Sequence, residues 1–476
     1  MSDTSELRRA ARGIFDAALG SMDAAAAVAG ALKLDGPRLE VADKSFNLAD
    51  RARKGAGVYA IAVGKAALPM ARALDAILGE HVAAGLVVGP AARLSRGSVK
   101  AASTADSLKS PRWRIMQGGH PLPDGASLRA ARAAFELLER AGAVQRALVI
   151  FLISGGGSAM IEWPRDPRIT LRELRAANRA LVSCGAKIAE INSVRRSFSA
   201  IKGGGLAARA ARADQLSLIV SDTGAGEEAN VASGPTFDPP LDAPDAREVI
   251  ARYGLAPRLP ASVLRAINQQ ATSNLAAAAA AAPARAIRAH YVLLDNARAI
   301  AAAARAARGR GFAVELARDI VEQPVAEGCA QLLERLRALR RRVEDERRVV
   351  CLISGGEFAC PVRGRGVGGR NAETMLRCAI EMGGRAPSQR AAAASSQRAE
   401  NVAALSAGTD GIDGNSPAAG AIIDQTTLRR ARRLRLDAQH FLDASDAYSF
   451  FDALGDAIVT GPTGTNVRDL RVLLAL

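Results

Sequence analysis

Two segments about 200 residues apart repeat the same local chemistry. Residues 148–160 read LVIFLISGGGSAM, and residues 349–360 read VVCLISGGEFAC. Each is a continuous apolar run that stops at Ile-Ser-Gly-Gly, which predicts a buried parallel strand ending in a tight turn. If a helix starts after such a turn, its free N–H groups and its dipole favour an anion. The repeat therefore constrains the chain to an α/β fold with two candidate phosphate or carboxylate turns, although ordinary strand-to-helix turns share the pattern.

Composition limits the class of protein. At 476 residues the chain is too long for one compact core, so two domains are expected. No run of 18 apolar residues exists, so we expect no membrane-spanning segment. The five cysteines are scattered, without a paired or metal-ligand spacing. This pattern is typical of reduced core cysteines in a cytoplasmic protein.

The formal net charge of +16 invites a nucleic-acid interpretation. However, only eight of the 64 basic residues are lysines, none lies after Lys202, and the arginines are dispersed through Ala-rich segments. That distribution indicates a solvated face with an Arg-for-Lys bias, so no nucleic-acid partner is expected. Because lysines are rare, those in Gly-rich or helix-entry motifs are worth attention, namely Lys65, Lys187 and Lys202.

Strand and helix patterns alternate along the chain, which predicts a doubly wound, mainly parallel sheet with helices on both faces. A Pro-rich passage at 234–260 separates two predicted domains, 1–250 and 255–476. The Ala-rich tract 274–286 predicts a helix ended by Pro283, and 383–400 predicts a polar loop. The predicted helices of the first half are 7–32, 67–78, 127–141, 188–200 and 206–212. The predicted strands are 58–63, 86–88, 148–153, 216–220, 291–294, 313–316, 349–353, 402–405 and 457–460.

Charged side chains follow several predicted strands. Lys65 comes directly after strand 58–63, at the carboxyl edge where α/β proteins bind ligands. Asp222 closes strand 216–220, and Asp410 and Asp413 follow strand 402–405. Such aspartates can hold Mg²⁺ or accept a proton from a substrate hydroxyl, and turn formation is the alternative role.

Glycine-rich and hydroxyl-bearing loops supply further candidates. Three glycines in GVGGRNAE present the planar guanidinium of Arg370 before a helix, which suits a phosphate or carboxylate. Backbone or hydroxyl donors to an oxyanion are expected from Ser154, Gly155, Gly156, Gly157 and Ser158. Candidate nucleotide contacts are Gly355, Gly356, Glu357, Gly368, Gly369, Thr463, Thr465 and Asn466.

Taken together, the motifs make the chain similar to the glycerate 2-kinase family, whose C-terminal part is called the MOFRL domain. Older names for family members include hydroxypyruvate reductase. The resemblance spans nearly the whole chain, with its motifs in order. The matching stretches are VGKAA (63–67), GGHPLPD (118–124), ISGGGSA (153–159), CGAKIAEINSVRRSFSAIKGGGLA (184–207), VASGPT (231–236), LISGGE (352–357), GVGGRNAE (366–373), SAGTDGIDG (406–414) and GDAIVTGPTGTNVRDL (455–470).

The resemblance implies two α/β domains: an N-terminal doubly wound Rossmann-like parallel sheet and a C-terminal α/β MOFRL-type domain, with the MOFRL region at about 348–470. It places the active site in the cleft between them, with ATP, Mg²⁺ and glycerate as ligands. Lys65 and Arg370 then act on the transferred phosphate, while Asp222 or Asp410 orients or deprotonates the substrate hydroxyl. The acid-substrate side is assigned to the Ser154–Ser158 turn with Asn192, Arg195 and Lys202. The metal candidates are Asp222, Asp410 and Asp413.

Three positions depart from the family pattern. Ala225-Gly226 stands where a Gly-Asp pair is usual, Ser197 where a His is frequent, and Ser416-Pro417 where Thr-Asp is usual. These changes leave open a kinase for a different hydroxy acid or a catalytically impaired relative. A hydroxypyruvate reductase is disfavoured because GKAALP replaces the GxGxxG expected after the first strand. Oligomeric state is left open by the sequence.

Overall fold

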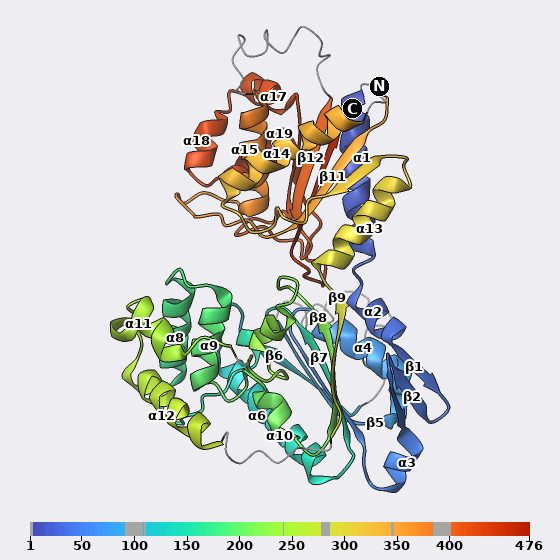
Figure 1. Cartoon of the computed structure of the whole chain (residues 1–476), viewed down its shortest axis with the longest axis vertical. Coiled ribbons are helices and arrows are strands. Elements are labelled where there is room, and N and C mark those ends of the chain that lie inside the picture. The colour runs from blue at the N-terminus through green and yellow to red at the C-terminus, as the bar shows by residue number, and fades with distance from the viewer. Residues whose placement is uncertain are drawn as a thin grey trace. The chain divides into compact units, whose positions relative to one another are not determined.

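The computed structural model describes residues 3–90, 108, 111–240, 242–277, 286–343, 347–383 and 401–476. The chain divides into two compact units (Figure 1). The central unit is Ala24–Leu293, and the composite unit combines Met1–Asp23 with Leu294–Leu476. The division differs from the predicted domains 1–250 and 255–476, because the first helix joins the C-terminal segment and the boundary lies near residue 293.

The central unit is built on a six-stranded sheet. Its strand order is β6-β5-β4-β7-β8-β9, or 3-2-1-4-5-6 when strands are numbered along the chain. The pairings from β6 through β8 are parallel. This order is that of a doubly wound dinucleotide-binding sheet, which confirms the predicted fold class. The strands are β4 (Val58–Val63), β5 (Val82–Pro90), β6 (Trp113–Gly118), β7 (Leu148–Ser154), β8 (Asp214–Val220) and β9 (Arg288–Leu294).

Helices cover both faces of this sheet, which explains the apolar strand sequences. All seven residues of β7 are buried, as expected for a central parallel strand. One face packs against α6 (Gly125–Ala143), α7 (Gly157–Met160) and α10 (Gly205–Arg209). The other face packs against α4 (Ala67–Leu78), which in turn contacts α2 (Ala24–Ala31). Helix α6 begins with a capping box in which Asp124 accepts from the Ser127 N–H.

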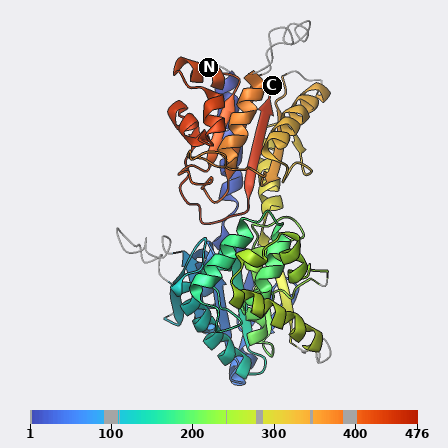
Figure 2. The same cartoon turned by 90° about the vertical axis from the view of Figure 1, so that its left-hand side faces the viewer.

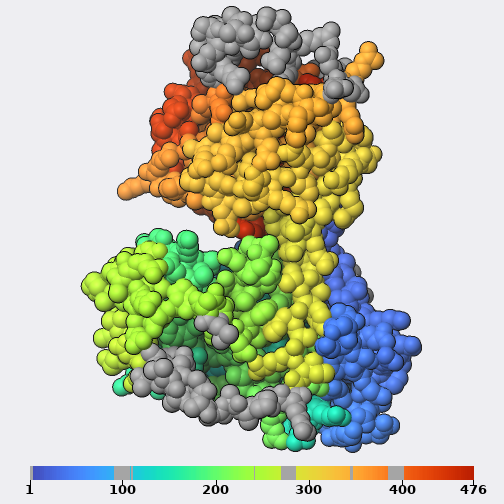
Figure 3. All heavy atoms as spheres, in the orientation of Figure 1, coloured from blue at the N-terminus to red at the C-terminus, as the bar shows by residue number. Residues whose placement is uncertain are grey.

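Two additions flank the central sheet. Four helices form a separate apolar cluster, which Figure 2 views face on: α8 (Leu171–Val182), α9 (Ile188–Phe198), α11 (Ala246–Arg252) and α12 (Ala261–Ala277). An antiparallel sheet, with α3 (Leu48–Arg53) after it, forms part of the blue surface in Figure 3; its strands are β1 (Leu32–Asp35), β2 (Arg38–Val41) and β3 (Lys44–Asn47). Short 3-10 turns occupy Gly79–His81, Glu228–Ser233 and Ala256–Arg258.

The composite unit has a mixed sheet. Its order is β10-β11-β15-β12-β13-β14, and only the β10–β11 pairing is parallel. Strand β15, the last in the sequence, therefore lies between β11 and β12 and runs antiparallel to both. The strands are β10 (Ala313–Leu316), β11 (Val350–Gly356), β12 (Val402–Gly408), β13 (Gly420–Asp424), β14 (Ala457–Ile458) and β15 (Asp469–Ala475).

Helices also cover both faces of the mixed sheet (Figure 1). One face packs against α1 (Asp3–Gly20) and α13 (Asn296–Arg308). The other packs against α14 (Val325–Arg342), α15 (Arg370–Gly383), α17 (Thr427–Arg433), α18 (Ala438–Asp443) and α19 (Ala447–Leu454). Among the described helices, none alone is long and apolar enough to cross a membrane, although the bent pair Thr4–Gly20 and Ala24–Ala31 passes that test jointly.

Several predicted elements need correction. The helix predicted at 7–32 is two helices, broken at residues 21–23. The first, α1, belongs to the composite unit, and the second, α2, packs on α4 in the central unit. The strand predicted at 291–294 belongs to β9 of the central sheet, and the strand at 457–460 shortens to Ala457–Ile458. The sequence pattern missed β1 to β3 and β6. Pro283 and nearly all of the predicted loop 383–400 lie outside the described residues.

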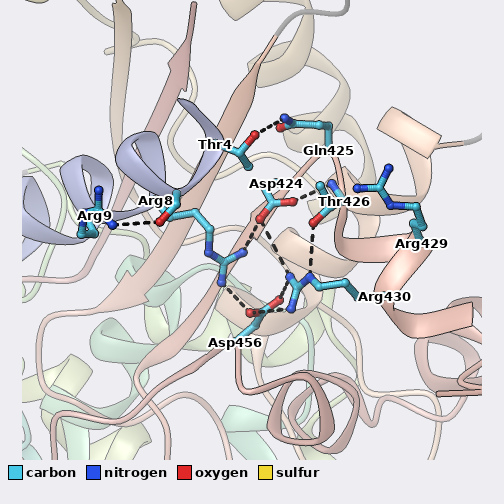
Figure 4. Close-up of a pocket in the computed structure, with 10 residues that line it drawn as sticks. Thr4, Arg8, Arg9, Asp424, Gln425, Thr426, Arg429, Arg430 and Asp456 are labelled. Atoms are coloured by element: carbon cyan, nitrogen blue, oxygen red, sulfur yellow. Dashed lines mark hydrogen bonds and ion pairs between the residues drawn. The ribbon is translucent and has the colours of Figure 1, made fainter. Parts of the chain in front are cut away.

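A buried ion network joins the N-terminal helix α1 to the C-terminal part of the composite unit (Figure 4). Arg8 Nη1 lies 2.7 Å from Asp424 Oδ2, and Arg8 Nη2 lies 2.5 Å from Asp456 Oδ1. Arg430 pairs with the same two carboxylates, and all four residues line a surface pocket. Asp424 and Asp456 are almost fully buried, so each requires a cationic partner. The network explains why α1 folds with residues more than 400 positions away.

We expect Arg8→Ala to lower the free energy of unfolding of the composite unit by about 1.5–3 kcal/mol, the range for hydrogen bonds to charged groups. Arg430 keeps part of the compensation, which limits the loss. The matched control is Arg12→Ala in the same helix, because Arg12 pairs with Asp16 at an exposed i,i+4 position and should change stability by less than about 0.5 kcal/mol. Urea unfolding compares the two variants, and equal losses would contradict the anchoring role.

Candidate active site

The first candidate site lies at the switch point of the central sheet. Strands β4 and β7 are neighbours, and the chain continues outward from them in opposite directions, to β5 and to β8. Val63 and Ile153 are in register, so both strands end at the same edge. Doubly wound sheets bind their ligands in the crevice at this position.

The residues at the carboxyl ends of β4 and β7 lie in close contact. Gly64 has a φ of 118°, and a Cβ there would collide with the Ser154 carbonyl. The Lys65 N–H donates to the Gly155 carbonyl at 2.9 Å, and the Ala66 N–H donates to Ser154 Oγ at 3.0 Å. The half-buried Lys65 side chain therefore starts from a backbone position fixed to the glycine turn.

The turn after β7 brings further predicted residues to this crevice. A Cβ at Gly155 would collide with the Asp222 carboxylate, so Asp222 lies directly against the turn. Gly156 adopts a left-handed φ of 81°, and a Cβ there would lie 3.3 Å from His120 Nε2. The Lys65 backbone, the turn and the Asp222 carboxylate thus lie together at this edge of the sheet, and His120 lies beside Gly156. The helix that follows, α7, has only four residues.

A hydrogen-bonded chain links the turn to α9. Ser158 Oγ lies 2.9 Å from Ser233 Oγ, and Ser233 Oγ donates to Asn192 Oδ1 at 2.9 Å. Asn192 Nδ2 in turn donates to Asn230 Oδ1 at 3.2 Å. Ser233 has a positive φ of 63°, which is uncommon for a residue other than glycine. Asn192 is buried and reaches the site through this chain.

Lys202 lies beneath the turn, and the sequence had predicted a contact with substrate. Its side chain is 1% exposed, pairs with the equally buried Glu162, and donates to the Ser158 carbonyl at 2.9 Å. Burial lowers the pKa of Lys202, and Glu162 opposes that effect. Arg195 is held similarly, because its Nε donates to Asn178 Oδ1 at 3.0 Å. Lys202 therefore supports the turn from below.

Lys202→Met should cost the central unit about 3–5 kcal/mol of unfolding free energy, because it strands the buried Glu162 charge. Adding Glu162→Gln removes that charge while keeping an acceptor for the Ser199 hydroxyl, so the double variant should recover part of the loss. Urea unfolding of both variants makes the comparison. A double variant less stable than Lys202→Met would contradict this interpretation.

The second candidate site lies at one edge of the composite sheet. Asp469, the first residue of β15, is in register with Gly356 at the end of β11 and with Gly408 at the end of β12. Three loops therefore meet around it. They carry the predicted residues Gly355, Gly356 and Glu357 after β11, Asp410 and Asp413 after β12, and Thr463, Thr465 and Asn466 before β15.

Arg370 opens α15 and points its guanidinium at Asp469. Its Nε lies 2.5 Å from Asp469 Oδ2, and its Nη2 lies 3.3 Å from Asp469 Oδ1 and 2.9 Å from Glu357 Oε1. Burial works to lower the pKa of Arg370, but Asp469 and Glu357 outweigh burial and raise it. Asp469 was missed from the sequence, where only its place before the apolar run at the chain's end marks it.

Asp413 accepts hydrogen bonds from the first turn of α15. Its two carboxylate oxygens accept from the Asn371 N–H at 3.0 Å and the Ala372 N–H at 2.8 Å. A Cβ at Gly369 would collide with this carboxylate, and the Gly368 N–H donates to Asn415 Oδ1 at 2.8 Å. The two predicted glycines therefore let the chain approach the Asp413 loop. Both oxygens of Asp413 thus accept N–H bonds at the start of α15, and its metal role stays a prediction.

Burial raises the pKa of Asp413 to about 7, against the lowering effect of the Ala372 and Asn371 N–H groups. From about pH 4 to about pH 7 the folded state then holds a proton that the unfolded state has released. The free energy of unfolding should therefore fall as pH rises through that window, by up to about 4 kcal/mol.

Asp413→Asn removes the titrating group and should flatten this part of the profile. The free energy of unfolding is measured with urea at several pH values for both proteins. The difference between wild type and variant at each pH isolates the contribution of Asp413. Parallel profiles for the two proteins would contradict the predicted pKa.

The second glycine turn differs from the first. No helix follows Gly356 directly, and its N–H donates to Asn296 Oδ1 at 2.9 Å, so the expected anion turn is partly filled. Asn296 Nδ2 also donates to the carbonyls of Val467 and Asp469. Beneath the turn, the fully buried Arg471 donates to the Gly355 and Gly356 carbonyls and lies 3.5 Å from the Phe358 ring centre. Burial lowers the pKa of Arg471 to about 10.

The hydroxyl and amide groups before β15 bond within that loop and to the start of the loop after β12. Thr463 Oγ1 donates to the Thr409 carbonyl at 2.6 Å, and the Thr465 N–H donates to Thr463 Oγ1 at 3.3 Å. Asn466 Oδ1 accepts from the Arg468 N–H at 3.1 Å. These contacts order the loop, and nucleotide binding by its side chains stays a prediction.

Single carboxylates, rather than a cluster, are available for a metal ion. Within the described ranges, no group of three or more His, Cys, Asp or Glu side chains has the arrangement of a metal site. Asp222 and Asp410 each lie at a strand's carboxyl end. Mg²⁺ in phosphotransferases is usually held by one or two carboxylates together with substrate phosphates, so these two residues fit that mode.

The sequence is similar to those of known proteins along most of its length. A family model described as a domain of unknown function, DUF4147, matches residues 10–268, and the MOFRL family model matches residues 350–469. A D-glycerate 2-kinase of Thermotoga maritima is 32% identical over 416 residues, covering 87% of this chain and 90% of that protein. The chain belongs to the glycerate 2-kinase family.

Other family members extend the comparison. The crystal structure of a glycerate kinase from Thermotoga maritima has a TM-score of 0.74 at 28% identity, covering 99% of this chain and all of that one. An Agrobacterium vitis protein, whose name provisionally assigns it as a hydroxypyruvate reductase, is 34% identical and covers 98% of this chain and 94% of its own length. Both names therefore occur within the glycerate 2-kinase family, as the sequence suggested.

The three departures from the family pattern have ordinary structural partners. Ser197 is buried in α9 and donates to the Ser193 carbonyl at 3.0 Å. Gly226 adopts a positive φ of 82°, and its N–H donates to Glu228 Oε1 at 3.0 Å. Ser416 donates to the Asp413 carbonyl at 2.8 Å, within the loop that caps α15.

Proposed function

We propose that the protein is an ATP-dependent D-glycerate 2-kinase. It transfers the γ-phosphoryl group of ATP to the 2-hydroxyl of D-glycerate, giving 2-phosphoglycerate and ADP. The observation that supports the proposal is the carboxyl edge at the switch point, where the Lys65 backbone, the Ser154–Ser158 turn and Asp222 lie together in a member of the glycerate 2-kinase family.

Each group has a role that phosphoryl transfer requires. Lys65 places positive charge on the transferred phosphoryl group, whose negative charge spreads over its equatorial oxygens, and Arg370 binds phosphate. The turn offers backbone N–H and hydroxyl donors to the glycerate carboxylate. Asp222 or Asp410 orients the 2-hydroxyl and accepts its proton as the new O–P bond forms.

Magnesium, when bound with ATP, would neutralise phosphate charge, and Asp222 or Asp410 would hold it. The remaining work falls to the chain's own residues. Lys202 and Glu162 keep the turn in place from below, and Asn192 with Ser233 fixes the Ser158 hydroxyl. Because these supports are buried, substrate binding need not order them first.

A kinase for a different short hydroxy acid is the second candidate. It is favoured by the departures at Ser197, Ala225-Gly226 and Ser416-Pro417, which change polar groups in motifs that the family shares. A reductase is disfavoured, because β4 is followed by Gly64-Lys65-Ala66-Ala67 in place of the glycine pattern of a dinucleotide site.

The deciding experiment is ADP release by purified protein with Mg-ATP, with and without D-glycerate, followed by ³¹P NMR to locate the phosphate on the product. Glycerate-dependent ADP with a 2-phosphate product would support the proposal. ATP binding without turnover on glycerate would redirect it, and a panel of short hydroxy acids would then separate the second candidate from a catalytically impaired relative.

Lys65→Ala should lower kcat by more than about tenfold, or roughly 1.4 kcal/mol of transition-state stabilisation. The matched control is Lys54→Ala, because Lys54 is an exposed lysine of the same unit that pairs only with neighbouring Asp50 in the contacts described. Steady-state kinetics with both substrates saturating makes the comparison. A smaller loss at Lys65, or an equal loss in both variants, would argue against its role on the phosphate.

A further inference from the structure

Arg370 has two carboxylate partners that differ in burial. Asp469 is 2% exposed, whereas Glu357 is 31% exposed and Arg370 itself is 36% exposed. Asp469 contacts two nitrogens of the guanidinium, Nε and Nη2, but Glu357 contacts only Nη2. One partner is therefore internal and bidentate, and the other is partly exposed and reaches the guanidinium through Nη2.

The two carboxylates also differ in how firmly the fold holds them. Asp469 is paired in β15 with strands on both sides, and its carbonyl accepts from Asn296 Nδ2 at 3.0 Å. Glu357 comes directly after Gly356, the last paired residue of β11. Moving Asp469 would disturb the centre of the sheet, whereas Glu357 can turn aside without breaking a strand pairing.

A guanidinium presents its donors in a rigid planar fork, so fixing two nitrogens fixes the direction of the others. Among the described residues, the contacts of Arg370 use Nε and Nη2, and none is made through Nη1. The outward edge of the fork is thus the edge that Glu357 occupies in part. A partly exposed ion pair made through one nitrogen is weaker than the buried bidentate pair with Asp469, so a phosphate with more charge can replace the Glu357 carboxylate.

We propose that Asp469 is the positioning residue for Arg370, and that Glu357 is a placeholder carboxylate which a nucleotide phosphate displaces. The inference rests on the proposed function, because it takes Arg370 as the phosphate-binding arginine. It changes the expectation for Glu357, which competes with the phosphate for Arg370 instead of binding the nucleotide.

The two carboxylates predict opposite effects. Glu357→Gln removes the competing charge, so the dissociation constant for ATP should fall by about two- to fivefold, a change that damage to the fold would not produce. Asp469→Asn loosens the fork, so kcat should fall by roughly tenfold to a hundredfold. Isothermal titration calorimetry with ATP gives the affinity, and saturating Mg-ATP with D-glycerate gives kcat.

Two controls assign the effect to Arg370. Glu322→Gln removes a similar charge from the Arg468 ion pair next to Asp469, and should leave ATP affinity within about twofold. In an Arg370→Ala background, Glu357→Gln should no longer tighten ATP binding, because the guanidinium for which Glu357 and phosphate compete is absent.

Three results would overturn the proposal. These are unchanged or weaker ATP binding by Glu357→Gln when the wild type binds ATP, tightening that persists without Arg370, and full kcat in Asp469→Asn. If Asp469→Asn fails to fold, the Glu357 and Arg370 variants still decide the question. A wild type that binds no ATP would instead remove the proposed function, and this inference with it.

Discussion

The close contact between the carboxyl ends of β4 and β7 is the constraint on which the central unit's site depends. Ser154 fills the space beside Gly64 with its carbonyl and hydroxyl, so only glycine fits there. The same contact ties the Lys65 and Ala66 N–H groups to the end of β7. The backbone of Lys65 and the Asp222 carboxylate are consequently fixed relative to the glycine turn. Stabilisation of a charged transition state requires groups that are fixed in this way.

The composite unit reaches a comparable result by a different construction. There the last strand enters antiparallel between two others, and Asp469 is placed where three loops meet. Each turn has a buried cation bonded to one of its carbonyls: Lys202 bonds to Ser158, two residues after the first Ile-Ser-Gly-Gly segment, and Arg471 bonds to Gly355 within the second. The repeated sequence thus has a repeated support, although only the first turn leads directly into a helix.

Elements determined by local pattern were predictable from the sequence. Strand 58–63 was predicted with its observed bounds, because a central parallel strand is apolar on both faces. The insertion of β15 could not be predicted, since antiparallel pairing with β11 and β12 depends on residues far apart in the sequence. For the same reason Asp469 and Asn296 were missed, and Lys202 was assigned to the substrate rather than to Glu162. Short polar motifs indicate a site, but burial decides which side chain supports and which one is presented.

The composite unit combines a segment that precedes the central unit in the sequence with segments that follow it. Its first helix, α1, can form its ion pairs only after Asp424 and Asp456 have been synthesised. The centre of its sheet can pair only after β15 has been synthesised. During synthesis the intervening Ala24–Leu293 unit can therefore complete its sheet while α1 still lacks its partners. The core of the central unit can thus form early, whereas the core of the composite unit forms late. Premature termination before β15 should leave the early helix with an uncovered apolar face, a target for chaperones and proteases.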